Sequence, residues 1–143
     1  MIEFNFDVDL KISNLDVLRD WITKTILAEN KDLGQLSYTF CDDSFLHKLN
    51  VEFLNHDTFT DILTFDYGMG NKINGEIFIS VDRVIENASL YQVTLENELH
   101  RVMIHGIFHL CGYKDESDED RNLMRSKEDE ALGQLSILIS KQE

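Results

Sequence analysis

Two histidines, His105 and His109, lie four residues apart within the otherwise apolar segment "VMIHGIFHLCG". Residues four apart on an α-helix project from the same face, so both imidazoles can reach one point in space. Gly112 follows, and a glycine lets the chain leave a helix in a left-handed conformation at little steric cost. Such a turn brings Asp115 back toward the histidines. We therefore predict that these three side chains bind one metal ion.

Two histidines and one carboxylate are a known ligand set for catalytic zinc, in which a fourth position stays open for water or substrate. A metal held in this way polarises an oxygen of the substrate and lowers the pKa of water to about 7. The predicted centre is hydrolytic, with one Zn²⁺ or another divalent cation at His105, His109 and Asp115. The alternative is that each histidine is a hydrogen-bonded core residue, which is the commoner role of a single histidine on an apolar helix.

Gly106 argues against a peptidase. Zinc peptidases with the H-E-x-x-H motif carry their general base, a glutamate, directly after the first histidine. This chain has Gly106 there. The motif would therefore lack its base, and we expect the glycine to leave space above the helix for a bulky substrate or a second helix.

Four other residues with reactive side chains are given structural roles. We predict that His100, five residues before His105, packs in the interior or supports the site, and that Glu98 is exposed. Cys111 is expected in the core, because it lies on a different face of the helix from His109. For His56, in the loop "NHDTFTD", the alternatives are a side chain that lines a cleft and a solvated one, and we expect the solvated side chain.

The pattern of apolar residues predicts an α+β fold. Apolar residues alternate with polar ones over residues 2–9, and β-rich runs cover 34–41, 60–68 and 74–81. Helical spacing covers 13–30, 42–54, 81–93, 94–112 and 117–140, and Ser117 with Asp120 resembles a capping box. We predict one domain over residues 1–143, with a small mixed sheet of about four strands, about five helices and a zincin-like metal-site helix. The order of the strands is left open.

Composition limits the class of protein. With 143 residues and 43% hydrophobic content, the chain can build one core. Cys41 and Cys111 form no disulfide framework, and no signal peptide or apolar stretch of about 18 residues is found, which together predict a cytoplasmic protein without a membrane span. The net charge of −14 argues against nucleic-acid binding, although it does not describe any one cleft.

Despite the acidic net charge, three segments of the sequence resemble those of a known protein family. "HGIFHLCGYKD" resembles the H-G-x-x-H-L-x-G-Y-D-H signature of the YbeY family of bacterial endoribonucleases, with matches at His105, Gly106, His109, Leu110, Gly112 and Tyr113. "LNVEFLNHDTFTDILTF" (49–65) resembles the family's L-N-x-x-F-R-x-x-D-x-x-T-D-V-L-S-F block, and "GEIFIS" (75–80) resembles its G-D-I-x-I-S strand. Order and spacing agree over residues 35–125.

The resemblance implies a metal-dependent endoribonuclease that cleaves single-stranded RNA and acts in ribosomal RNA maturation and ribosome quality control. Its implied partners are ribosomal RNA and the ribosome or its small subunit. The residues leave open whether water or the ribose 2′-hydroxyl attacks the phosphorus. The alternative is a non-catalytic ribosome-assembly or adaptor protein whose metal is structural.

The chain departs from the family's pattern at two places. Asp115 stands where the family has its third histidine, and Lys114 stands where the preceding aspartate would be. Leu54 replaces the arginine that the resemblance marks as important for activity. Because leucine cannot contact a phosphate, we take Lys114 as the candidate that holds the scissile phosphate.

Overall fold

A computed structural model describes residues 1–56 and 60–141. Its sheet has the strand order β1-β2-β4-β3, formed by β1 (Ile2–Phe6), β2 (Asp32–Cys41), β3 (Ile62–Asp66) and β4 (Lys72–Ser80). β1, β2 and β4 run parallel, and β3 is antiparallel to β4. The predicted mixed sheet is therefore confirmed.

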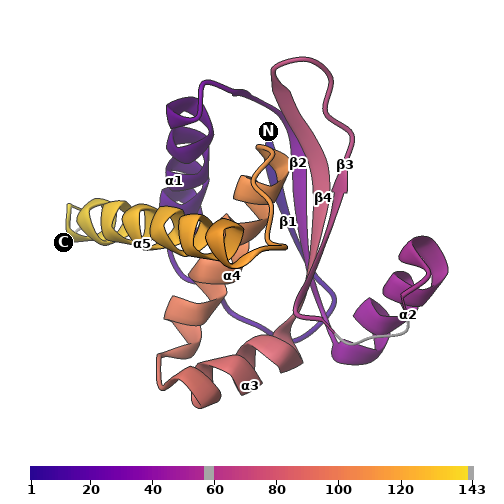
Figure 1. The fold of residues 1–143 in the computed structure, drawn as a ribbon. Helices are drawn as coiled ribbons and strands as arrows, with labels where there is room; N and C mark the ends of the chain where they lie inside the picture. The colour runs from indigo at the N-terminus through magenta and orange to yellow at the C-terminus, as the bar shows by residue number, and fades with distance from the viewer. Residues whose placement is uncertain (57–59, 142–143) are drawn as a thin grey trace.

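The predicted helices are also present, and they cover both faces of the sheet. Figure 1 shows α1, α4 and α5 on one side and α2 on the other. The helices are α1 (Leu15–Ala28), α2 (Asp43–Leu54), α3 (Val81–Tyr91), α4 (Leu95–Leu110) and α5 (Asp118–Ser140). The predicted capping box of Ser117 and Asp120 begins α5. None of the described helices is long and apolar enough to cross a membrane.

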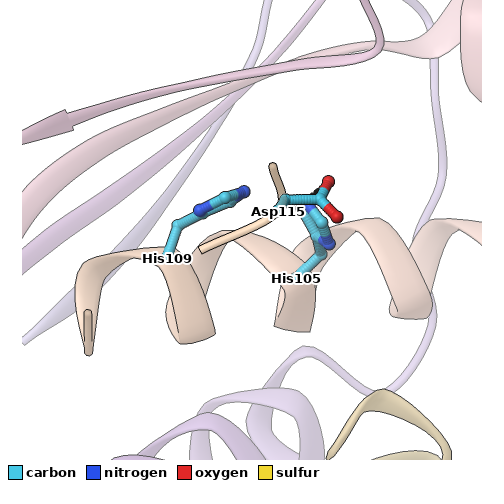
Figure 2. A group of neighbouring side chains, drawn as sticks. All are labelled: His105, His109 and Asp115. Atoms are coloured by element: carbon cyan, nitrogen blue, oxygen red, sulfur yellow. Dashed lines mark ion pairs between the residues drawn. The ribbon is translucent and has the colours of Figure 1, made fainter. Parts of the chain in front are cut away.

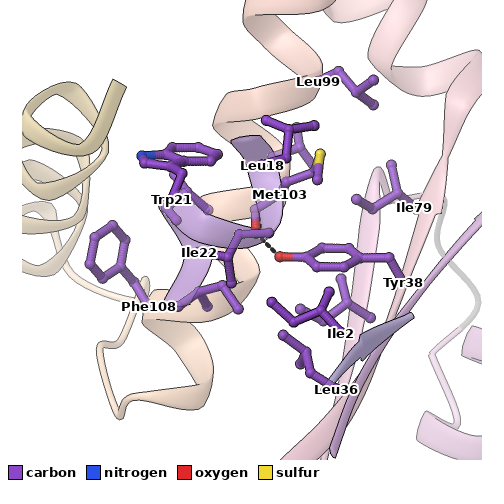
Figure 3. Packing of buried hydrophobic residues seen from close by; sticks show 14 of the residues in the cluster. Ile2, Leu18, Trp21, Ile22, Leu36, Tyr38, Ile79, Leu99, Met103 and Phe108 are labelled. Carbon is purple, nitrogen blue, oxygen red and sulfur yellow. Dashed lines mark hydrogen bonds between the residues drawn. The ribbon is translucent and has the colours of Figure 1, made fainter. Parts of the chain in front are cut away.

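The main core lies between the sheet and α1, α4 and α5, and two hydrogen bonds fix these helices within it. The buried Tyr38 of β2 donates its hydroxyl to the carbonyl of Met103 on α4 at 2.9 Å (Figure 3). The buried Trp21 of α1 donates its indole N–H to the carbonyl of Ala131 on α5 at 2.8 Å. Because a buried polar group without a partner costs free energy, both bonds select one arrangement of the helices.

Gly106 does not leave the space that the sequence suggested. The residue is buried, and a Cβ atom on it would lie 3.0 Å from Cδ1 of Ile62 and 3.1 Å from Cδ1 of Ile77. The sheet fills the space above this turn of α4. The prediction of room for a substrate or a second helix is therefore wrong, and the glycine serves close packing of α4 on the sheet.

We predict that Gly106→Val lowers the free energy of unfolding by about 1–3 kcal/mol, because the added side chain has to displace Ile62 and Ile77. The matched control is Gly133→Val on α5, where a Cβ atom meets nothing within 4 Å. Urea unfolding followed by circular dichroism measures both. Equal stability of the two variants would contradict the close packing.

Candidate metal centre

The three predicted ligands come together at the C-terminal end of α4. Figure 2 shows the rings of His105 and His109 beside the carboxylate of Asp115, which lies in the segment after the helix. One potential ligand atom from each residue lies within 4.8 Å of the other two. Nε2 of His105 is 3.8 Å from Oδ2 of Asp115. Ligand atoms around a tetrahedral zinc ion lie about 3.3 Å apart, so small side-chain movements would bring these atoms to that spacing.

The turn that carries Asp115 is a Schellman motif, a standard way to end a helix. Gly112 has the left-handed φ of 105° that the sequence predicted. Its N–H donates to the carbonyl of His109 at 3.0 Å, and the N–H of Tyr113 donates to the carbonyl of Phe108 at 2.9 Å. The rings of Phe108 and Tyr113 pack edge to face with centroids 5.5 Å apart. This contact fixes the direction in which the chain leaves α4 toward Asp115.

Each imidazole has a partner at Nδ1, which determines what its other nitrogen can do. Nδ1 of His109 lies 3.1 Å from the carbonyl oxygen of Tyr113, and Nδ1 of His105 lies 2.6 Å from Oε2 of Glu128. Both partners accept hydrogen bonds, so they favour the tautomer with the proton on Nδ1. The lone pair of Nε2 is then available on each ring, which is the arrangement usual in metal-binding histidines.

The carboxylates around His105 favour a positive charge close to its ring, whether a proton on the ring or a cation that takes the proton's place. Burial alone would lower the pKa of His105, but the hydrogen bond and negative charge of Glu128 and the charge of Asp115 outweigh it and raise the pKa. Burial and the neighbouring His105 lower the pKa of His109. A neutral imidazole beside a pair of carboxylates suits a cation, and the residues present fit a divalent metal ion.

Two cavities meet at this cluster. One of about 690 Å³ is lined by Leu54, Lys114 and His109, and the other, of about 460 Å³, is lined by Glu128 and by three arginines of α4 and α5. Asp61, His105 and Asp115 line both cavities. The arginines are Arg101, Arg121 and Arg125. The cluster is therefore open to a substrate, and the smaller cavity beside it carries these arginines together with the carboxylates of Asp61, Glu98, Asp115 and Glu128.

Comparison with known proteins decides the family. The model of the family described as "Endoribonuclease YbeY" matches residues 5–136. The chain belongs to the YbeY family. A relative named Endoribonuclease YbeY from Flavobacterium johnsoniae is 52% identical over 137 residues, covering 96% of this chain and 99% of the relative. One of the same name from Christiangramia forsetii is 47% identical over 136 residues, covering 95% of each chain.

A solved structure shares the fold. The solution structure of TM1509 from Thermotoga maritima aligns with a TM-score of 0.62 at 28% identity, covering 94% of this chain and 91% of that one. The resemblance to the YbeY family and the α+β fold are therefore confirmed. Residues 57–59 of the L-N-x-x-F-R block lie outside the described residues.

The other residues considered in the sequence fall into three groups. His100 is buried with its ring 6.1 Å from that of Trp21, and the half-buried Cys111 packs against the core, so both structural roles are confirmed. Lys114 and His56 are exposed and line the larger cavity, which makes His56 part of the cleft as well as solvated. The prediction of an exposed Glu98 is wrong, because only 4% of it is exposed and burial raises its pKa.

Two carboxylates of this YbeY-family site were missed in the sequence. Glu128 lies within the apolar stripe of α5, between the buried Met124 and Ala131 at helical spacing, and an acid in such a stripe was a usable signal. Asp61 directly precedes β3, and burial raises its pKa while the nearby His105 partly offsets the shift. Nothing in the local pattern of Asp61 reveals that it lines both cavities.

Proposed function

We propose that this YbeY-family chain is a metal-dependent endoribonuclease that cleaves single-stranded ribosomal RNA. The observation that carries the proposal is the placement of His105, His109 and Asp115 where two solvent-open cavities meet. Residues 1–143 act as one hydrolase domain with one divalent cation, Zn²⁺ being the first candidate. The wider setting that we propose is ribosomal RNA maturation and ribosome quality control in the cytoplasm, with the small ribosomal subunit as partner.

The residues of the site have three separate roles: metal binding, orientation of an imidazole and contact with a phosphate. His105 and His109, through Nε2, and Asp115 would hold the cation, which would supply positive charge to stabilise the charge that develops on the phosphate during cleavage. The carbonyl of Tyr113 orients the ring of His109. Lys114, at the rim of the larger cavity, offers an ammonium group to a phosphate.

Proton transfer is assigned to Asp61. This carboxylate faces both cavities, and it is placed to accept a proton from the attacking water or ribose 2′-hydroxyl. The products distinguish these two nucleophiles, since attack by the 2′-hydroxyl leaves a 2′,3′-cyclic phosphate and attack by water does not.

Metal removal tests the proposed function. Protein dialysed against a chelator should lose cleavage of a single-stranded RNA, and one equivalent of Zn²⁺ or another divalent ion should restore it. Metal content by mass spectrometry should rise to one ion per chain in parallel. Undiminished cleavage by protein shown to be free of metal would reject the metal-dependent mechanism.

Substitutions at Lys114 and Leu54 should change the affinity for RNA in opposite directions. Lys114→Ala is expected to weaken binding several-fold and to reduce the dependence on salt by about 0.7 in log–log slope, as expected for one lost contact to a single strand. Leu54→Arg should strengthen binding, because Leu54 lines the same cavity. Fluorescence anisotropy at several salt concentrations measures both effects.

Lys24→Ala, on the exposed surface of α1, is the control. An unchanged salt slope in Lys114→Ala would remove Lys114 from the phosphate site.

A non-catalytic ribosome-assembly or adaptor protein is the second candidate. It is favoured by Leu54, which offers no charge where the family's pattern has arginine, and by the net charge of −14. In that case RNA or ribosome binding would persist without cleavage at any metal concentration, and loss of the metal would lower only the melting temperature.

A further inference from the structure

We propose that Glu128 is a positioning residue that holds His105 in the orientation and tautomer needed to bind the cation. This inference rests on the proposed function, since it concerns the same metal centre. The inference adds a residue from α5, a helix that contributes none of the three predicted ligands.

The contact between the two side chains is short and buried. Oε2 of Glu128 lies 2.6 Å from Nδ1 of His105, and the side chains are 6% and 19% exposed, respectively. A carboxylate accepts hydrogen bonds and cannot donate them, so Nδ1 carries the proton and Nε2 keeps its lone pair. Nε2 is the nitrogen that lies 3.8 Å from Asp115.

Arg101 holds the glutamate in place. Its Nη1 donates to Oε1 of Glu128 at 3.0 Å, and its Nη2 donates to Oδ1 of Asp129 at 2.9 Å. The two oxygens of Glu128 therefore have different partners, the arginine and the histidine. Rotation of the carboxylate would break both bonds in a buried setting, where a lost partner of a charged group is costly.

The two histidines are supported by different means, and this makes Glu128 testable. His109 is oriented by a backbone carbonyl, that of Tyr113, which substitution of a side chain does not remove. His105 is oriented by a side chain 23 residues away in the sequence. Groups that orient metal-binding histidines typically contribute about 10–100-fold to metal affinity.

The docking of α5 does not depend on Glu128 alone. Met124, Ala131 and Leu135 of α5 are buried in the core, and the carbonyl of Ala131 accepts the hydrogen bond from Trp21. A substitution at Glu128 should therefore leave the helix in place. This allows metal binding to be measured in a folded variant.

The test compares Glu128→Gln with Glu130→Gln, the same change at an exposed position of the same helix. Zn²⁺ affinity is measured by competition with a chromogenic chelator, and the environment of the ion by the visible spectrum of the Co²⁺-loaded protein. We expect Glu128→Gln to lose about 10–100-fold in affinity and to change the Co²⁺ spectrum, with Glu130→Gln matching the parent. A glutamine cannot accept from both His105 and Arg101 as the carboxylate does.

Two further measurements separate the outcomes. Arg101→Gln removes the ion pair between Arg101 and Glu128 but leaves the longer one from Arg125, at 3.8 Å, and the bond to His105. A purely structural role for Glu128 predicts lower stability in both variants with unchanged affinity and spectrum. Long-range ¹H–¹⁵N NMR of the Zn²⁺-loaded parent should show His105 protonated at Nδ1, and protonation at Nε2 would overturn the inference even if Glu128→Gln does not fold. A parent that binds no ion contradicts the proposed function, whereas a parent and a Glu128→Gln variant that bind equally well contradict only the role of Glu128.

Discussion

His109→Ala is expected to lose the metal ion and, with it, RNA cleavage. Substituting a residue that only orients a ligand costs about 10–100-fold in metal affinity, so removing a ligand itself should cost more than about 100-fold. In a metal buffer that leaves the parent only just saturated, the variant would then be largely metal-free, and its cleavage rate should fall to that of the chelated parent. Metal analysis and single-turnover cleavage of a labelled single-stranded RNA measure the two losses separately.

The matched control is His47→Ala. His47 belongs to α2 and lines neither of the cavities that meet at the metal centre. Its variant should retain one ion per chain and the parent's rate. The far-ultraviolet circular dichroism of His109→Ala should match that of the parent, because the side chain faces a cavity and its removal does not disturb the core. Retention of both metal and cleavage by His109→Ala would contradict the assignment of the site.

Asp61→Asn is expected to slow cleavage by about 10²-fold or more while leaving the metal content unchanged. A general base contributes typically about 10²–10⁴-fold, and an amide cannot accept the proton that a carboxylate accepts. The backbone carbonyl of Asp61 accepts a hydrogen bond from the N–H of Ser80 at 2.9 Å, and this bond survives the substitution. Asn87 donates to Oδ2 of Asp61 at 3.4 Å, a contact that the oxygen of an asparagine can keep.

Single-turnover rates at saturating RNA distinguish this role from one in binding. Asp20→Asn, an exposed carboxylate of α1, serves as the control for the loss of one negative charge. If Asp61→Asn cleaves as fast as the parent, Asp61 is not the base and proton transfer has to be assigned elsewhere. If the variant has lost its metal as well, Asp61 supports the centre itself.

The cluster of His105, His109 and Asp115 was predictable because its geometry is local. The spacing of His105 and His109 places both on one face of a helix whatever that helix packs against, and Gly112 marks the Schellman turn that leads to Asp115. The start of α5 was also predictable, because Ser117 and Asp120 form the capping box that the sequence indicates. These features depend on contacts within a few residues, which a sequence pattern records directly.

The supporting residues depend on contacts between distant segments. Glu128 reaches His105 only because α5 crosses α4, and Asp61 reaches the site only because β3 pairs with β4 at the edge of the sheet. Gly106 was misread for the same reason, since the residues that fill its space come from β3 and β4. Glu98 is different: it lies seven residues before His105 on the same face of α4, so helical spacing alone could have placed it at the site.

The most direct test of the metal centre is a crystal structure of the zinc-loaded protein with data collected on both sides of the zinc absorption edge. We expect one anomalous peak between Nε2 of His105, Nε2 of His109 and the carboxylate of Asp115. A peak elsewhere in the chain, or none between these three side chains at full zinc occupancy in solution, would contradict the site on which the proposed function rests.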